Sequence, residues 1–215
     1  DVLHLPDGRF ERLAVRSIVG IIPLFAVEIL EPEILDALPE FTRKLEWFIR
    51  HRPDLHENVA SMESQGVNAR RLLSVCGRER LRRVLERILD ETEFLSAGGV
   101  RSLSKQHLHQ PFVLDIGGME HRVEYEPAES RTGGYGGNSN WRGPVWFPVN
   151  YLLIEALQKF DHYYGEDFTV ECPTGSGRMS NLWRVAAELS RRLVTLCEQP
   201  VPGWPGQTLF FEYFD

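Results

Sequence analysis

The chain has 215 residues, 42% of them hydrophobic and 26% charged, a balance typical of a globular protein with a sizeable core. Its net charge of −7 argues against an extended nucleic-acid-binding surface. No apolar run reaches the roughly 18 residues that a membrane-spanning helix needs. We therefore expect neither nucleic acid nor a membrane as a partner.

Helical patterns dominate the chain from its beginning. Residues 15–30 are apolar almost all round, which predicts a helix buried on both sides. Residues 31–53 carry apolar side chains along one stripe, which predicts a second helix that ends at Pro53. Helical spacing predicts three further helices, at residues 78–90, 149–165 and 178–198.

Alternating, strand-like runs occur at residues 112–116 and 121–125, and Gly117 and Gly118 lie between them. This pattern predicts one short β-hairpin. Long loops between paired helices fit a toroid of helical hairpins, in which functional residues lie on loops at one rim. The expected fold is therefore mainly α, a single domain over residues 1–215.

The loop before the fourth expected helix, residues 133–150, reads GGYGGNSNWRGPVWFPVN. Its glycines let the backbone approach a ligand closely. The indoles of Trp141 and Trp146 can stack on sugar rings, while Asn140 and Arg142 can hydrogen-bond to hydroxyl groups. The loop is suited to a polyhydroxylated ligand. A structural alternative is equally open, with both tryptophans in the core and Arg142 paired with a carboxylate.

The cysteines and carboxylates are less informative. Cys76, Cys172 and Cys197 are odd in number and far apart, which indicates a reducing cytoplasm without structural disulfides. No histidine pair has zinc-ligand spacing, so we expect no metal and no cofactor. Glu212 lies among four aromatic residues, an environment that can mark a catalytic acid or base.

The stretch GGNSNWRGPVWFPVNYLLIEAL resembles the signature of the carboxy-terminal catalytic domain of glycoside hydrolase family 63. The segments GVRSLS, EYEPAESRTGGYGGNSNWRGP, HYYGEDFTVECPTGSG and FFEYF resemble the same family, so the resemblance covers nearly the whole chain. It implies an (α/α)₆ barrel and an inverting glycosidase. An α-glucosidase-like enzyme that acts on a small glucoside or a glycosyl-glycerate is the implied activity.

The resemblance also implies roles for individual residues. Glu212 matches the glutamate that acts as general base in a late, aromatic-rich motif. The sugar subsite maps onto six residues of the loop and the following helix, namely Asn140, Trp141, Arg142, Gly143, Trp146 and Asn150. The family's general acid is an aspartate in an earlier part of the barrel, and no residue here matches it.

These implications predict that the chain is the C-terminal portion of one catalytic domain and is nearly inactive alone. Its expected partners are a small carbohydrate and the preceding part of the same protein. If the chain proves active, Glu126 or Glu129 becomes the acid to test.

Two other functions stay open: a non-catalytic carbohydrate-binding or interaction module, and a helical scaffold without a ligand. An open half-barrel also exposes core, so we expect a homodimer through the apolar face of residues 15–30.

Overall fold

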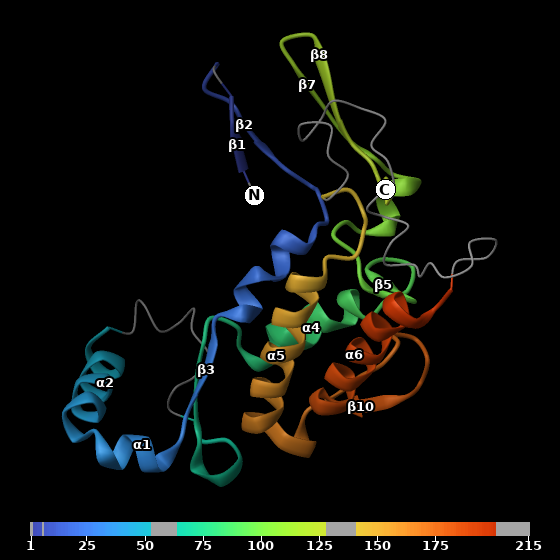
Figure 1. The fold of residues 1–215 in the computed structure, drawn as a ribbon. Helices are drawn as coiled ribbons and strands as arrows, with labels where there is room; N and C mark the ends of the chain where they lie inside the picture. Colours follow the sequence, from blue (N-terminus) through green and yellow to red (C-terminus); the bar gives the residue numbers. More distant parts are fainter. Residues whose placement is uncertain (1, 6, 53–63, 128–140, 201–215) are drawn as a thin grey trace.

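The computed structural model describes residues 2–5, 7–52, 64–127 and 141–200 (Figure 1). About 48% of this part is helical, as the sequence predicts for a mainly α protein. The strands form two-stranded antiparallel sheets, and no parallel pair occurs within the described ranges. The described part is therefore a helical body that carries several small β-ribbons.

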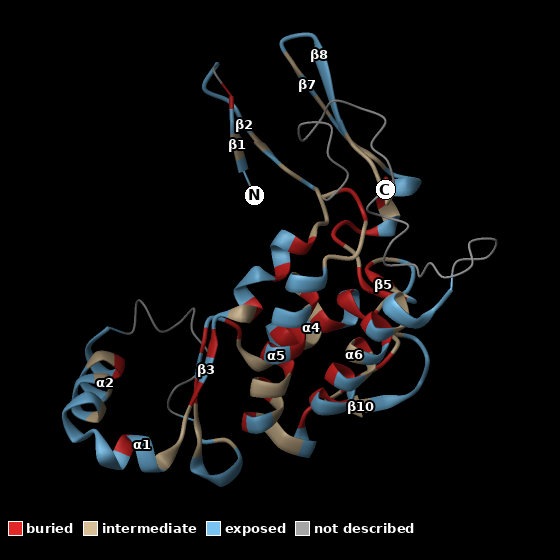
Figure 2. Cartoon of the chain, in the orientation of Figure 1, coloured by how far each residue is buried: buried red, intermediate tan, exposed pale blue. Residues whose placement is uncertain are grey.

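The core lies where α5 (Phe147–Tyr164) and α6 (Leu182–Glu198) pack side by side against α4 (Arg78–Ile88). Figure 2 shows buried residues concentrated on these three helices. Gly165 ends α5 with a positive φ of 59°, a conformation that favours glycine at a helix end. The Asn181 side chain accepts a hydrogen bond from the Arg184 N–H at 2.9 Å and so caps the start of α6.

The predicted helix over residues 15–30 is wrong. The segment forms a 3₁₀ helix, η1 (Ile18–Phe25), followed by strand β3 (Val27–Leu30), which pairs with β4 (Arg71–Ser74). Pro23 has no N–H to donate to a continuous α-helix. The side chains of Val27 and Ile29 point into the core while that of Glu28 points out, a strand alternation that the apolar composition concealed.

The predicted helix over residues 31–53 is two helices, α1 (Pro32–Ala37) and α2 (Pro39–His51). Leu38 lies between them with φ −122° and ψ 64°. A residue that precedes a proline is disfavoured in the α region, so Pro39 breaks the helix and starts the next one. The last predicted helix begins at Leu182 rather than at residue 178, because residues 179–181 form a strand.

The hairpin of β7 (Phe112–Ile116) and β8 (Met119–Val123) confirms the predicted one, with its second strand starting two residues earlier. The sequence predicted one strand pair, but the described part of the chain has five. The remaining elements are β1 (Val2–His4), β2 (Phe10–Arg12), β5 (Leu95–Ser96), β6 (Gly99–Val100), β9 (Thr169–Glu171), β10 (Met179–Asn181), η2 (Val67–Ala69), η3 (Lys105–Leu108) and η5 (Gly165–Asp167).

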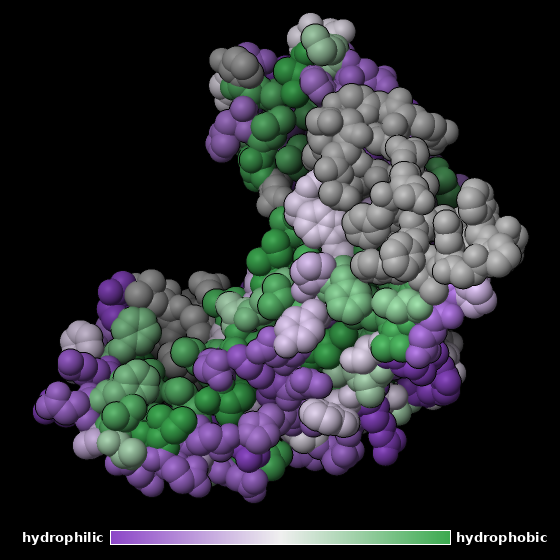
Figure 3. Space-filling model, in the orientation of Figure 1, coloured by the Kyte–Doolittle hydropathy of each residue, from purple (hydrophilic) through white to green (hydrophobic). Residues whose placement is uncertain are grey.

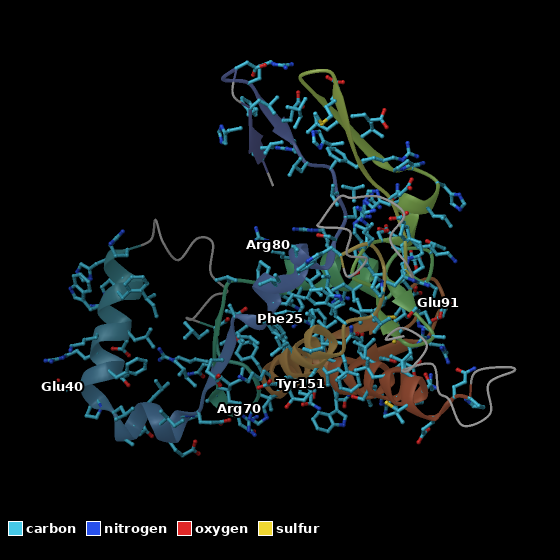
Figure 4. All side chains as sticks on the ribbon, turned by 45° about the horizontal axis from the view of Figure 1, so that its top comes forward. Phe25, Glu40, Arg70, Arg80, Glu91 and Tyr151 are labelled. Carbon is cyan, nitrogen blue, oxygen red and sulfur yellow. The ribbon has the colours of Figure 1, made fainter. Side chains whose placement is uncertain are left out.

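Two groups of elements project from the helical body in Figure 1. Helices α1 and α2 form an arm beyond β3, and the β1–β2 and β7–β8 ribbons project at the other end. At the base of the arm, Arg70 donates to both carboxylate oxygens of Glu31 at 3.1 and 2.9 Å. Figure 4 shows Phe25 of η1 packed beside the body and Glu40 on the outer side of the arm.

Candidate active site

The loop of residues 141–146 leads directly into α5, whose first turn contains a proline. The rings of Trp141 and Trp146 have centroids 4.3 Å apart and are tilted by 50°. Both side chains are half-buried, and Trp141 packs against the hydrophobic core. The two indoles therefore form a tilted aromatic pair with part of its surface accessible, which suits stacking against a ligand ring.

Arg142, between the two tryptophans, has no exposed surface. Its Nη1 forms an ion pair with Glu126, whose side chain is 2% exposed. The Glu126 N–H donates to the Arg142 carbonyl oxygen at 2.6 Å. This pairing is the one that the structural alternative for Arg142 expected. In this conformation Arg142 has no surface for a ligand and holds the loop to the segment after β8.

Gly143 follows with a φ of 143°, a conformation that side-chain-bearing residues rarely adopt. A Cβ atom there would lie 2.5 Å from the ring of Tyr125. The Gly143 N–H donates to the Ser102 Oγ at 2.9 Å. Glycine is therefore required at this position by both its backbone and its surroundings.

Asn150, in the first turns of α5, is also fully buried. Its Oδ1 accepts from the Val100 N–H at 2.8 Å, and its Nδ2 donates to the carbonyl oxygens of Val100 and Trp146, both at 2.9 Å. The amide is thus engaged on both sides by the backbone. The structure gives Asn150 the role of a tie between α5 and β6, and direct contact with a sugar stays a prediction.

Three other predicted residues, Asn140, Glu129 and Glu212, lie outside the described residues. Glu126 lies within them. Its carboxylate forms an ion pair with the fully buried Arg142, which gives Glu126 a structural role beside the loop.

Sequence reasoning missed the supporting role of Ser102 and the environment of His107. Nothing in GVRSLS marks a nucleophile, and the structure makes Ser102 a fully buried hydrogen-bonding residue. The His107 Nε2 accepts from the Arg16 N–H at 2.9 Å, and its Nδ1 donates to the Gln110 carbonyl oxygen at 3.0 Å. Both ring nitrogens of His107 therefore serve the fold.

A cavity of about 500 Å³ lies at the other end of α5 and contains none of the predicted site residues. Tyr163 on its wall is 17 residues beyond Trp146, which places it about 25 Å away at 1.5 Å per residue. The Arg78 guanidinium lies 5.1 Å from the Tyr164 ring centroid, and burial raises the pKa of Tyr164 to about 12. We assign the candidate site to the loop of residues 141–146, which contains the aromatic pair and is called the tryptophan loop below.

Neither metal nor membrane chemistry is indicated in the described ranges. They contain no group of three His, Cys, Asp or Glu side chains that could hold a metal ion. None of their helices combines the length and apolar composition needed to cross a bilayer. Cys76 and Cys172 are free and buried, and burial raises the pKa of both thiols.

Comparison with known proteins connects this site to a family. Residues 70–172 match the model of the glycosyl hydrolase family 63 C-terminal domain. The chain is also similar to the uncharacterized protein YMR196W of Saccharomyces cerevisiae, with 52% identity over 197 residues. That alignment covers 91% of this chain but 18% of the yeast protein, so the chain spans a small part of the length of this relative.

The matched range contains every described residue of the tryptophan loop together with Ser102, Tyr125, Glu126 and Asn150. Residues 70–172 therefore correspond to part of the C-terminal domain of glycoside hydrolase family 63.

Proposed function

We propose that the chain is the C-terminal portion of an inverting glycoside hydrolase with an (α/α)₆ barrel. The family match over residues 70–172 carries this proposal, because it includes the tryptophan loop and the residues that hold it. The proposed substrate is a small α-glucoside or glycosyl-glycerate. The odd number and wide spacing of the three cysteines support a cytoplasmic location.

In this proposal the aromatic pair supplies the sugar-binding wall. The accessible parts of the Trp141 and Trp146 rings stack on the C–H face of the glucosyl ring. Arg142 and Asn150 support that wall from below, since both are fully buried. The sugar hydroxyls are bound by Asn140 and by groups from the rest of the protein.

Glu212 is the proposed general base. It takes a proton from a water molecule whose oxygen attacks the anomeric carbon, while a general acid protonates the departing glycosidic oxygen. In inverting enzymes the two carboxyl groups are about 6.5–9.5 Å apart, which leaves room for that water. We propose that the acid comes from the preceding part of the protein, so that the chain alone is nearly inactive on ordinary glucosides.

A substrate with an activated leaving group tests the base separately from the acid. General acid catalysis contributes about 10²–10⁴ in rate, and a glucosyl fluoride needs little of it because fluoride departs readily. We expect slow release of β-glucose from α-glucosyl fluoride, followed by NMR of the anomeric proton. Glu212→Gln should abolish this release, and the matched control Glu198→Gln, an exposed residue of α6, should not.

Hydrolysis of an ordinary α-glucoside by the chain at an enzyme-like rate would contradict the missing acid. Formation of α-glucose from the fluoride would contradict inversion.

The alternative function is a non-catalytic carbohydrate-binding module on the same helical body. The ion pair between Glu126 and Arg142 favours this alternative, because the Glu126 carboxylate beside the loop binds an arginine of the protein itself. Calorimetric titration with glucose and glucosylglycerol distinguishes the alternatives. Binding that Trp146→Ala weakens, and that Trp183→Ala on α6 leaves unchanged, supports a sugar site at the loop. No heat with any sugar favours a scaffold without a ligand.

A further inference from the structure

Residues 100–102 run alongside residues 143–150, and each of the three is bound to them. Val100 exchanges two hydrogen bonds with the Asn150 amide at 2.8 and 2.9 Å. Arg101 forms an isolated antiparallel bridge with Val145. The Ser102 N–H donates to the Pro144 carbonyl oxygen at 2.9 Å. These hydrogen bonds and the bridge fix the backbone of the loop against residues 100–102.

Ser102 binds the loop through its side chain as well as through its backbone. Its Oγ accepts from the Gly143 N–H at 2.9 Å, and the side chain is fully buried. Its carbonyl oxygen accepts from the Ile18 N–H at 2.8 Å, at the start of η1. Since Ile18 belongs to the hydrophobic core, Ser102 joins the loop directly to that core.

Tyr125 also lies close to Gly143. A Cβ atom on Gly143 would lie 2.5 Å from the Tyr125 ring, and the Arg101 Nε donates to the Tyr125 hydroxyl at 3.1 Å. The position of Gly143 is therefore limited by both the Ser102 hydroxyl and the Tyr125 ring. Trp141 lies two residues before Gly143, and Trp146 lies three residues after it. The position of Gly143 therefore affects the distance and the tilt between the two indole rings.

We propose that Ser102 is a positioning residue, whose hydroxyl fixes Gly143 and thereby sets the tilt between Trp141 and Trp146. Its effect on sugar binding rests on the function proposed above. Its effect on the aromatic pair does not, because that geometry exists without a ligand.

Circular dichroism measures the aromatic pair directly. Two indoles with centroids 4.3 Å apart couple their transitions, and the resulting couplet depends on the angle between the rings. We expect Ser102→Ala to reduce this couplet to the level of Trp146→Phe. The matched control is Ser104→Ala. Ser104 is equally buried, but its hydroxyl accepts from the Gln106 N–H and donates to Glu93, so the couplet should persist.

An unchanged couplet in folded Ser102→Ala protein would overturn the proposal. If that variant does not fold, hydrogen exchange of the unmodified protein provides the test. The Gly143 amide should then be protected as strongly as amides in α5, and exchange at the rate of an unprotected amide would equally overturn the proposal.

Sugar titrations of the same variants separate this inference from the proposed function. Loss of both the couplet and the affinity for glucose or glucosylglycerol in Ser102→Ala supports both. Loss of the couplet in a protein that binds no sugar supports the positioning role and counts against the proposed function. Loss of affinity with an intact couplet overturns the positioning role and leaves the proposed function standing.

Discussion

The Arg142–Glu126 ion pair is the clearest energetic feature of the loop, because both side chains are almost completely removed from water. Arg142→Met should destabilise the protein by about 3–5 kcal/mol, since it removes one partner of a buried ion pair. Glu126→Gln should act in the same direction, and the double variant should cost less than the sum of the two. Urea denaturation measures all three.

The exposed pair of Arg9 and Asp7 provides the control, with side chains 67% and 52% exposed. Arg9→Met should leave the urea midpoint unchanged, because exposed ion pairs contribute little to stability. Equal stability of Arg142→Met and the unmodified protein would show that the buried pair is not needed.

Gly143 combines a positive φ with a close neighbour. Gly143→Ala should cost about 1–3 kcal/mol from the backbone conformation alone, with the contact to the Tyr125 ring adding to it. Gly118→Ala is the matched control: Gly118 has a φ of 82°, but a Cβ there meets nothing within 4 Å. Thermal unfolding should show the larger loss for Gly143. Equal losses would mean that Tyr125 moves aside.

At the scale of secondary-structure elements, α6 is held to β5 by a cluster of charges. The Arg192 Nη1 donates to the Ser96 carbonyl oxygen at 2.7 Å, and Glu188 accepts from the Nε atoms of Arg191 and Arg192 at 2.9 and 2.8 Å. The hydrogen bond from Arg191, and then that from Arg192, lowers the pKa of Glu188 from 4.5 to about 2. The ion pairs of Glu188 with Arg191 and Arg192 therefore contribute to stability only while Glu188 is ionised.

The folded-state pKa of Glu188 is depressed, so its contribution is complete above pH 4.5 and is lost as the pH falls towards 2. Glu188→Gln should remove this step and destabilise the protein at neutral pH by at most about 3 kcal/mol, less after solvent screening. Urea midpoints measured across this pH range check the prediction. Glu198→Gln, on the exposed end of the same helix, should leave this loss of stability at low pH unchanged. If the loss persists in Glu188→Gln, it comes from another group.

At the scale of the whole molecule, the α1–α2 arm exposes an apolar face. Leu38, Phe41 and Trp47 are 51%, 43% and 56% exposed, and Figure 3 shows apolar surface over this arm. The sequence placed the apolar surface on residues 15–30, where Ile18, Ile21 and Leu24 are buried but Val19 and Ile22 are 38% and 48% exposed. The arm is therefore a second candidate for a contact between two copies, beside the exposed side chains of residues 15–30.

We predict that the chain self-associates through this arm, because exposed apolar surface favours association. Light scattering at high concentration should show a homodimer, and the double change Leu38→Glu and Phe41→Glu should give a monomer. Met119→Glu is the control, since Met119 is an exposed apolar residue of the β7–β8 hairpin. A monomeric unmodified protein would contradict the prediction.

The sequence by itself determined the elements whose signals are local. Residues 78–88 and 147–164 form helices where the 3.6-residue period predicts them, and Gly117 with Gly118 turns the predicted hairpin. The tryptophan loop could also be located from its residues, because glycines and prolines break regular structure wherever they occur.

Only the tertiary structure decided the features that depend on a distant partner. Residues 27–30 become a strand because residues 71–74 pair with them, although their apolar composition fits a helix as well. Arg142 and Asn150 look like ligand-binding residues until Glu126 and the Val100 backbone occupy them. A side chain's donors and acceptors are visible in the sequence, but burial and long-range contacts decide whether they bind a ligand or the protein itself.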